Sequence, residues 1–175
     1  IFRKGNKRLF KSQNDKVNRR ESSYFWEERN IWFSDVWTDL RGVVQKTGKD
    51  NMRERTAAYP FELAYRLINM FSAKGEIVID PFLGTGTTTL AAIASNRDSI
   101  GIDIDRSFIG HALDYITNVK ISSINDYIEK RIEKHMIFVK DRKKSHGMDA
   151  LKYNNQHHGY GVMTKQEVNG KFDFV

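Results

Sequence analysis

The chain contains 175 residues, of which 39% are hydrophobic and 29% charged, so it can bury the core of one ordinary domain beneath a polar surface. It has no run of roughly eighteen apolar residues, which excludes a membrane-spanning helix, and its basic start predicts no signal peptide. The absence of cysteine excludes disulfides and thiolate metal sites, as is typical of an intracellular protein.

The net charge of +7 is concentrated in residues 1–20. That stretch holds eight basic side chains and one acid, Asp15, so the rest of the chain is neutral overall. A basic arm attracts the phosphate backbone of DNA, because each neutralised phosphate releases counterions. A solvated tail explains the same charge equally well. The residues that we predict to contact DNA are Arg3, Lys4, Lys7, Arg8 and Lys11.

An aromatic-rich segment follows between residues 24 and 37. Its apolar spacing fits neither a helix nor an alternating strand, so we expect irregular structure and one short strand. Trp26, Trp32 and Trp37 could stack on a base, although such large rings more often belong to a core. Residues 46–54 are polar and predict a loop.

Regular elements begin at Pro60. Apolar residues at three- and four-residue spacing over 63–71 predict an amphipathic helix with Pro60 near its first turn. The run Ile77-Val78-Ile79, bounded by glycines, predicts a buried parallel strand. We expect a second helix over 87–95 and a second strand over 99–102.

A third helix should start at Asp105, whose side chain can cap it, and should carry an apolar stripe from Phe108 to Ile116. Short strands and helices therefore alternate from Pro60 onward. This order predicts an α/β fold with an open, doubly wound, mostly parallel, Rossmann-like sheet.

The pattern is weaker beyond residue 120. A helix is expected over 124–132, and residues 136–139 either continue it or form a strand. We expect a charged loop over 140–144 and a final strand over 172–175. The predicted division of the chain is a basic and aromatic connecting region that could contact DNA (1–50), an α/β cofactor-binding core (51–120), and a helix with a polar extension (121–175).

The chemistry is concentrated where the first strand meets the second helix. A strand there delivers Asp80 at its carboxyl end, and Gly84 and Gly86 then allow a sharp turn into a helix start. Free N–H groups in the first turn of that helix suit an anionic group such as a carboxylate. Asp103 ends the next strand, where an acid can accept hydrogen bonds from ribose hydroxyls.

The same residues discriminate between ligands. No lysine follows Gly86, as a phosphate-binding loop would require, and Thr89 stands where a dinucleotide motif needs its third glycine. Asp80 would also repel a pyrophosphate, whereas it suits an ammonium or hydroxyl group. An amino acid joined to a nucleoside fits these features better, and S-adenosylmethionine is such a molecule.

The segment Asp80–Thr88, with the sequence DPFLGTGTT, resembles the cofactor motif of the N4-cytosine/N6-adenine DNA methyltransferases. Upstream, AAYPFEL (57–63) resembles the segment that those enzymes place beside the methionine moiety, and downstream, GIDID (101–105) resembles their ribose-binding strand end. The order is that of the permuted subclass, in which the catalytic half comes first, and the resemblance covers residues 31–117. It implies S-adenosyl-L-methionine as the cofactor, bound by Ala58, Tyr59, Pro60, Asp80, Pro81, Phe82, Gly84, Thr85, Gly86, Thr87, Asp103, Ile104 and Phe108.

One part of the family pattern is absent. Those enzymes hold the amino group of an extruded base with an Asp/Ser/Asn-Pro-Pro-aromatic tetrapeptide, whereas Pro60 and Pro81 are the two prolines here and are not adjacent. We therefore predict no catalytic residue among these residues. With no cysteine and no His-x-x-x-His spacing near the pair His157-His158, we predict no metal ligand either. In the permuted order the tetrapeptide would lie before Ile1, which predicts a missing amino-terminal half or one carried on a separate chain.

The resemblance implies that the sheet is of the methyltransferase kind and is incomplete in this chain. It also implies a site-specific methyltransferase that modifies cytosine N4 or adenine N6 in double-stranded DNA. It also implies the cytoplasm of a prokaryotic cell and a cognate restriction endonuclease in the same restriction-modification system. One alternative is a cofactor- and DNA-binding subunit, or an inactive relative, that lacks its own tetrapeptide. Another is an α/β domain for a different nucleoside ligand, such as a nicotinamide dinucleotide.

Overall fold

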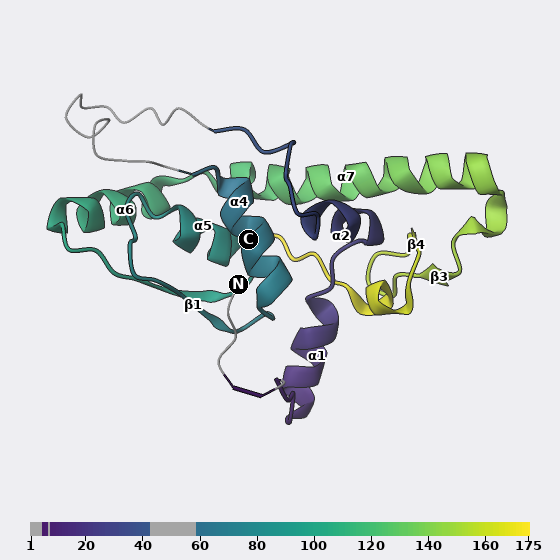
Figure 1. The fold of residues 1–175 in the computed structure, drawn as a ribbon, viewed down its shortest axis with the longest axis horizontal. Helices are drawn as coiled ribbons and strands as arrows, with labels where there is room; N and C mark the ends of the chain where they lie inside the picture. The colour runs from purple at the N-terminus through teal and green to yellow at the C-terminus, as the bar shows by residue number, and fades with distance from the viewer. Residues whose placement is uncertain (1–4, 7, 43–58) are drawn as a thin grey trace.

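A computed structural model describes residues 5–6, 8–42 and 59–175 (Figure 1). Helices dominate these residues, and none of the helices described is both long enough and apolar enough to cross a membrane. The elements, in chain order, are α1 (Gln13–Glu21), α2 (Trp26–Trp32), α4 (Phe61–Phe71), β1 (Ile77–Asp80), α5 (Thr87–Ala94), β2 (Asp98–Gly101), α6 (Arg106–Asn118), α7 (Ile121–His146), the 3-10 helix η1 (Met148–Ala150), β3 (Tyr153–Asn154), β4 (Gly161–Val162) and the 3-10 helix η2 (Lys165–Asn169).

The central unit is a parallel pair of strands. β1 and β2 lie side by side in register, with Ile77 opposite Asp98 and Asp80 opposite Gly101, and α5 crosses over between them. Figure 1 shows α5 and α6 on the same side of this pair. The predicted α/β class with a parallel sheet is confirmed, and the sheet has only these two parallel strands among the described residues. A short antiparallel pair, β3 and β4, lies elsewhere in the chain.

The prediction that β1 is buried was wrong for one of its two faces. Val78 is half-buried and packs against the core, whereas Ile77 and Ile79 are 59% and 62% exposed. Their neighbour on β2, Ile100, is 48% exposed. Successive side chains of a strand point to opposite faces, so the helices cover one face and no described residue buries the other.

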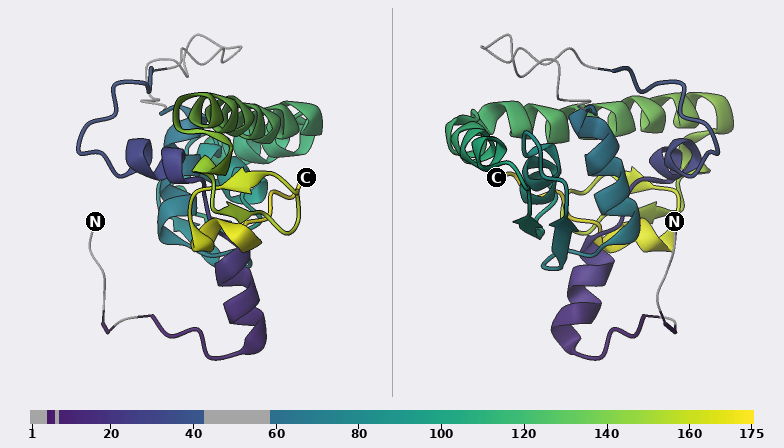
Figure 2. Two further views of the ribbon diagram at one scale, coloured as in Figure 1. Left: turned by 90° about the vertical axis from the view of Figure 1, so that its right-hand side faces the viewer. Right: turned by 60° about the vertical axis from the view of Figure 1, so that its left-hand side comes forward.

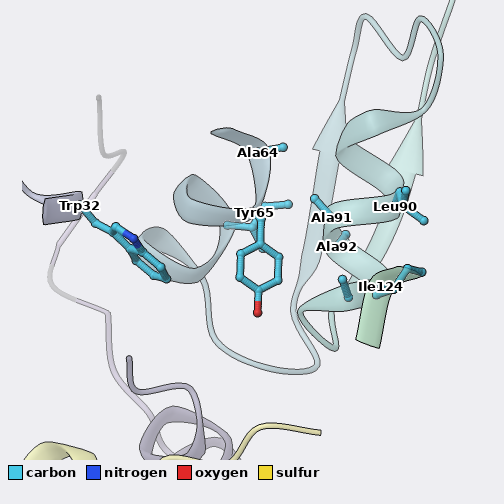
Figure 3. Packing of buried hydrophobic residues seen from close by; sticks show 9 residues of the cluster. Trp32, Ala64, Tyr65, Leu90, Ala91, Ala92 and Ile124 are labelled. Carbon is cyan, nitrogen blue, oxygen red and sulfur yellow. The ribbon is translucent and has the colours of Figure 1, made fainter. Parts of the chain in front are cut away.

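The main core lies between α4 and α5. Its buried residues include Ala64, Ala91 and Ala92, whose small side chains let the two helices approach closely. Figure 3 shows the ring of Tyr65 between Trp32 and the alanines of α5. The predicted helix that Pro60 opens is confirmed, with Pro60 at its N-cap.

The aromatic-rich segment contains a helix rather than the predicted short strand. α2 begins where the Glu28 carboxylate accepts a hydrogen bond from the Phe25 amide at 3.0 Å, which replaces one missing helical partner. Trp32 is 4% exposed, which confirms a core role for that ring. The indole of Trp37 is half-buried and donates to the Trp32 carbonyl at 3.0 Å.

α2 is fastened to α7 by buried polar contacts. Arg131 donates to both carboxylate oxygens of Glu28, at 2.6 and 2.7 Å, and to the Tyr65 hydroxyl at 2.5 Å. His135 is fully buried, stacks on Phe25 at a ring distance of 3.8 Å, and has its Nδ1 2.6 Å from a carboxylate oxygen of Glu27. Two-pronged Arg–carboxylate contacts fix orientation as well as distance, so the register of α2 against α7 is well defined.

The loop predicted over 140–144 is instead the last part of α7. The helix continues to His146 and ends at Gly147, whose φ of 88° falls in the left-handed region that favours glycine. Lys143, Lys144 and His146 lie in its last turn, where positive charge complements the helix dipole. The charged residues over 140–144 therefore belong to the end of a helix. The other predicted loop, over 46–54, lies outside the described residues.

The final strand predicted over 172–175 was also wrong. Phe172 is buried in a second cluster with Phe25 and Ile128, and Val175 donates from its amide to the Asn125 side chain at 2.9 Å. These contacts attach the segment to α7 and α2 instead of to a sheet edge. The three-part division of the chain stays a prediction.

Candidate cofactor site

The glycine turn connects β1 to α5. At its start, the Asp80 carboxylate accepts a hydrogen bond from the Phe82 amide at 3.0 Å. Gly84 and Gly86 have φ values of +52° and +83°, a region that residues with a Cβ adopt only at a cost, so both turns favour glycine. The Gly86 amide closes the turn by donating to the Leu83 carbonyl at 2.9 Å.

The start of α5 presents unfilled donors to this turn. Gly86 is the N-cap residue and provides no side-chain cap. Helices leave their first N–H groups without helical partners and carry partial positive charge there. Thr85 and Thr87 hold their hydroxyl oxygens 3.4 Å apart at the same place. This end of α5 can therefore accept a carboxylate.

Asp103 stands at the end of β2 and touches the glycine turn directly. One of its carboxylate oxygens accepts from the Gly84 amide at 2.9 Å, and the other accepts from the Asp105 amide at 2.9 Å. An ionised carboxylate has about four lone-pair positions, so these two bonds leave acceptor capacity for two hydroxyl groups. Asp105 caps α6 through the Ser107 amide, as predicted, so helix capping does not require Asp103.

Tyr59 brings the segment before α4 to the same edge. Its hydroxyl is hydrogen-bonded to the Thr88 hydroxyl and lies 3.5 Å from a carboxylate oxygen of Asp80. Burial raises the pKa of Tyr59, and the negative charge of Asp80 raises it further. Thr88 is the last residue of the DPFLGTGTT motif but was not among the predicted site residues. The sequence alone does not indicate which residues a threonine within a helix contacts.

The remaining residues predicted to bind the cofactor are more exposed or lie apart from the contacts between Asp80, Asp103 and the glycine turn. Phe82 is 85% exposed beside the exposed Pro81, and Ile104 is fully exposed after Asp103. Phe108 is half-buried in the first turn of α6. Ala58 lies outside the described residues.

A cavity of about 460 Å³ opens beside this cluster, between α4 and β1. Tyr59 and Thr88 line one end of it, and most of its other lining residues are apolar side chains of α4. Asp80, Gly84 and Asp103 are not among its lining residues. The two carboxylates and the glycine turn therefore lie outside the cavity, at the carboxyl edge of the sheet, and the apolar cavity is adjacent to them.

The predicted basic arm has only part of its residues described. Arg8 makes an ion pair with Glu76, and its guanidinium lies 5.3 Å above the Phe10 ring. Lys11 is exposed. The other three residues predicted to contact DNA, Arg3, Lys4 and Lys7, lie outside the described residues.

Comparisons with known proteins agree with this geometry. A family model described as DNA methylase matches residues 1–114. The type II methyltransferase M.MthZI of Methanothermobacter thermautotrophicus is 47% identical over 167 residues, which cover 95% of this chain and 45% of that protein. The type II methyltransferase M.MjaI of Methanocaldococcus jannaschii is 50% identical over 107 residues, which cover 61% of this chain and 34% of that protein.

A solved structure also resembles this chain in fold. The crystal structure of TTHA0409, a DNA modification methylase from Thermus thermophilus, superposes with a TM-score of 0.51 at 31% identity, covering 64% of this chain and 41% of that one. The chain thus spans less than half the length of each of these relatives. The family model, the relatives and the order of the motifs agree, and the chain belongs to the N4-cytosine/N6-adenine DNA methyltransferase family.

Proposed function

We propose that this chain is the cofactor-binding part of an S-adenosylmethionine-dependent methyltransferase, which acts on the N4 amino group of cytosine or the N6 amino group of adenine in double-stranded DNA. The observation that carries the proposal is the bond between Asp103 and the Gly84 amide. It brings a carboxylate suited to ribose hydroxyls beside a turn whose helix start suits a carboxylate. Family membership supports the same assignment.

The donor set fits an amino-acid nucleoside. The open N–H groups at the start of α5 would receive the carboxylate of the methionine part, and Asp80 would receive its ammonium group. Asp103 would accept from the ribose hydroxyls through the lone pairs that its two backbone bonds leave free. The bound cofactor would supply an activated methyl group on a sulfonium centre. The residues of this chain orient it, and alignment of this kind lowers the barrier to transfer.

A further part of the protein is needed to hold the base. Pro60 and Pro81 are the two prolines of the chain, so the Pro-Pro-aromatic tetrapeptide that holds the amino group is absent from it. We infer that further strands of the same sheet carry the tetrapeptide, and that the helices connecting those strands cover the face that exposes Ile77, Ile79 and Ile100. That apolar face and the neighbouring cavity are what an incomplete sheet would leave open. The names of the relatives support a partner restriction endonuclease in the same system.

Calorimetric titration of the chain with S-adenosylmethionine tests the site. Asp103→Ala should weaken binding by about 1–3 kcal/mol, because it removes a charged acceptor. Asp114→Ala is the matched control, since it removes an exposed acid from α6 and should leave the affinity unchanged. Unchanged affinity in Asp103→Ala would remove this residue from the site, and tighter binding of a nicotinamide dinucleotide would favour another nucleoside ligand.

A second function is favoured by the missing tetrapeptide: a cofactor- and DNA-binding subunit, or an inactive relative, without its own catalytic group. The two functions differ in methyl transfer once the missing part is present. The chain alone, incubated with duplex DNA and radiolabelled cofactor, should give no methylated DNA in either case, and methylation by it would eliminate the binding-subunit function and contradict the need for a further part. Methylation by the chain together with a part that carries the tetrapeptide would favour the enzyme over the binding subunit.

A further inference from the structure

A second cavity, of about 280 Å³, lies where the end of α1, the start of α2 and the turn before η2 meet. These elements are separate from the glycine turn and from α6. The cavity is strongly basic, and no carboxylate is among the described residues that line it. Its walls include Arg19, Arg20 and Arg29, together with Tyr24, Trp26 and Gln166.

The side chains of the three arginines have no partner within the described part of the protein. Each is exposed, and none of their guanidinium groups makes an ion pair or hydrogen bond with any residue that the structure describes. Burial raises the pKa of the Tyr24 hydroxyl, while the charges of Arg19 and Arg29 lower it, as expected if both guanidinium groups face that ring. Three like charges around one cavity repel each other, so an anion placed between them is stabilised.

The nearby carboxylates are turned away from the cavity. Glu28 is bound by Arg131, and Glu27 contacts His135, both on the side of α2 that faces α7. Glu167 is 3% exposed and accepts from the Trp26 amide at 2.9 Å. Glu21, next to Arg20, does not line the cavity, and its charge acts on Lys74 and Lys171. These acids therefore do not neutralise the arginines.

α1 supports the same conclusion from its packing. It has no buried residue, and both views in Figure 2 show it projecting away from the rest of the chain. Its last turn delivers Arg19 and Arg20, and the aromatic rings of Tyr24 and Trp26 stand next to them in half-buried positions. Guanidinium groups bind phosphate through paired hydrogen bonds, and aromatic rings pack against sugars and bases.

We propose that this cavity, lined by Arg19, Arg20 and Arg29, binds backbone phosphates of duplex DNA. The proposal rests on the proposed function, because it names a second place where the same substrate touches the chain. Phosphate contacts of this kind position a duplex without reading its sequence. On this proposal, the positive charge that faces DNA lies at the end of α1. Arg8, which the sequence predicted to contact DNA, is instead paired with Glu76.

Salt dependence of DNA binding is the decisive measurement. The probe is a fluorescein-labelled duplex of about 30 base pairs and mixed sequence, titrated by anisotropy between about 50 and 200 mM NaCl. The triple variant Arg19→Gln/Arg20→Gln/Arg29→Gln should bind roughly tenfold more weakly or worse at the lowest salt. Its slope of log affinity against log salt should fall by about 2 to 3, close to 0.9 for each lost phosphate contact.

The matched control is Lys130→Gln. It removes one charge from an exposed position of α7, outside the cavity, and should leave the slope unchanged. Gln166 offers a second test that leaves the arginines in place. Gln166→Glu should weaken DNA binding, and Gln166→Lys should strengthen it. Circular dichroism checks that each variant is folded.

The outcomes separate this proposal from the proposed function. A wild-type slope in the triple variant, an equal loss per removed charge in Lys130→Gln, or no salt-dependent binding by the wild-type chain would each overturn the phosphate site. S-adenosylmethionine affinity, measured on the same variants, should stay at the wild-type value. Failure of the wild-type chain to bind that cofactor would instead contradict the proposed function and leave the DNA result intact.

Discussion

The carboxylate of Asp103 accepts a hydrogen bond from the Gly84 amide at 2.9 Å, and this bond ties the end of β2 to the glycine turn that follows β1. The other oxygen of the same carboxylate accepts from the Asp105 amide at 2.9 Å, just before α6 begins. One side chain therefore fixes two loops at the carboxyl edge of the sheet. The residue that we propose to bind ribose therefore also fixes the conformation of the glycine turn.

Asp103→Asn should lower the free energy of unfolding by about 1 kcal/mol, because an amide has one acceptor oxygen and its NH₂ group would face a backbone N–H. Asp105→Asn is the control two residues away, and asparagine caps a helix as well as aspartate does, so its change should stay within about 0.5 kcal/mol. Urea denaturation followed by tryptophan fluorescence measures both. Equal losses in the two variants would show that the Gly84 bond contributes nothing specific.

The glycine turn gives a second prediction, from two glycines in different surroundings. At Gly86, a Cβ would lie 3.1 Å from the Ala112 Cβ and 3.2 Å from the Ile116 Cδ1, and φ is +83°. Gly110 lies inside α6 with nothing within 4 Å of its Cβ position. Gly86→Ala should therefore destabilise the chain by about 2–4 kcal/mol, through left-handed strain and overpacking.

Gly110→Ala should instead stabilise by about 0.5–1 kcal/mol, because it lowers the entropy that a helix must lose on folding. Thermal unfolding of the two variants should thus shift in opposite directions. Destabilisation of similar size in both would mean that the close approach of α6 to the turn does not constrain Gly86.

The sequence was most informative where signals are local. The run at Ile77–Ile79, the glycine turn and the Asp105 cap each depend on residues within a few positions, and the structure has the expected elements there. The position of α2 depends on Glu28 meeting Arg131, which is 103 residues away, so no local pattern reveals it. The end of α7 did carry a local signal in Gly147, which the surrounding charges obscured.

Within the candidate site, residue types were easier to predict than contacts. Asp80 and Asp103 were identified as carboxylates at strand ends, and the structure brings both beside the glycine turn. The contact between Tyr59 and Thr88 depends on how α4 packs on α5, which only the fold determines. The prediction that β1 is buried was wrong for the same reason, because burial of a strand depends on what covers each face of the sheet.

The two faces of β1 give a third prediction. Val78 packs against the core, whereas Ile79 is 62% exposed in the described chain. Val78→Thr should lower the free energy of unfolding by about 1–2 kcal/mol, because it places a hydroxyl against apolar side chains. Ile79→Thr keeps the β-branched shape on the open face and should change stability by less than about 0.5 kcal/mol.

Chemical denaturation of both variants at one pH makes the comparison. A larger loss for Ile79→Thr than for Val78→Thr would mean that the outer face of β1 is already covered in the chain. That result would contradict the proposal that helices from the missing part of the protein pack there.

His158 gives a prediction about pH. Its Nε2 accepts a hydrogen bond from the Phe172 amide at 3.1 Å, which requires the neutral ring. Desolvation lowers the pKa of His158, and the charge of neighbouring His157 lowers it further. The effects of Lys74 and Lys171 act in the same direction, and Asp173 opposes them.

A folded-state pKa below the unfolded value means that the unfolded chain binds the proton more readily. The stabilisation from His158 is therefore complete above the ordinary value of 6.5 and is lost as the pH falls below it. The carboxyl groups with lowered pKa, such as Asp39 and Asp173, lose their contribution only at lower pH, below 3.8. Between about pH 5 and pH 7, the histidine effect can be measured separately.

His158→Gln provides an acceptor oxygen for the Phe172 amide but does not titrate in this range. The wild-type chain should lose stability from pH 7 to pH 5, with a lower protection factor against hydrogen exchange at the Phe172 amide, and the variant should lose less. Because Phe172 packs on Phe25 and Ile128, release of its amide at low pH would loosen the attachment of the carboxy-terminal segment to α2 and α7. If wild type and His158→Gln lose stability in parallel, the neutral histidine does not hold that segment.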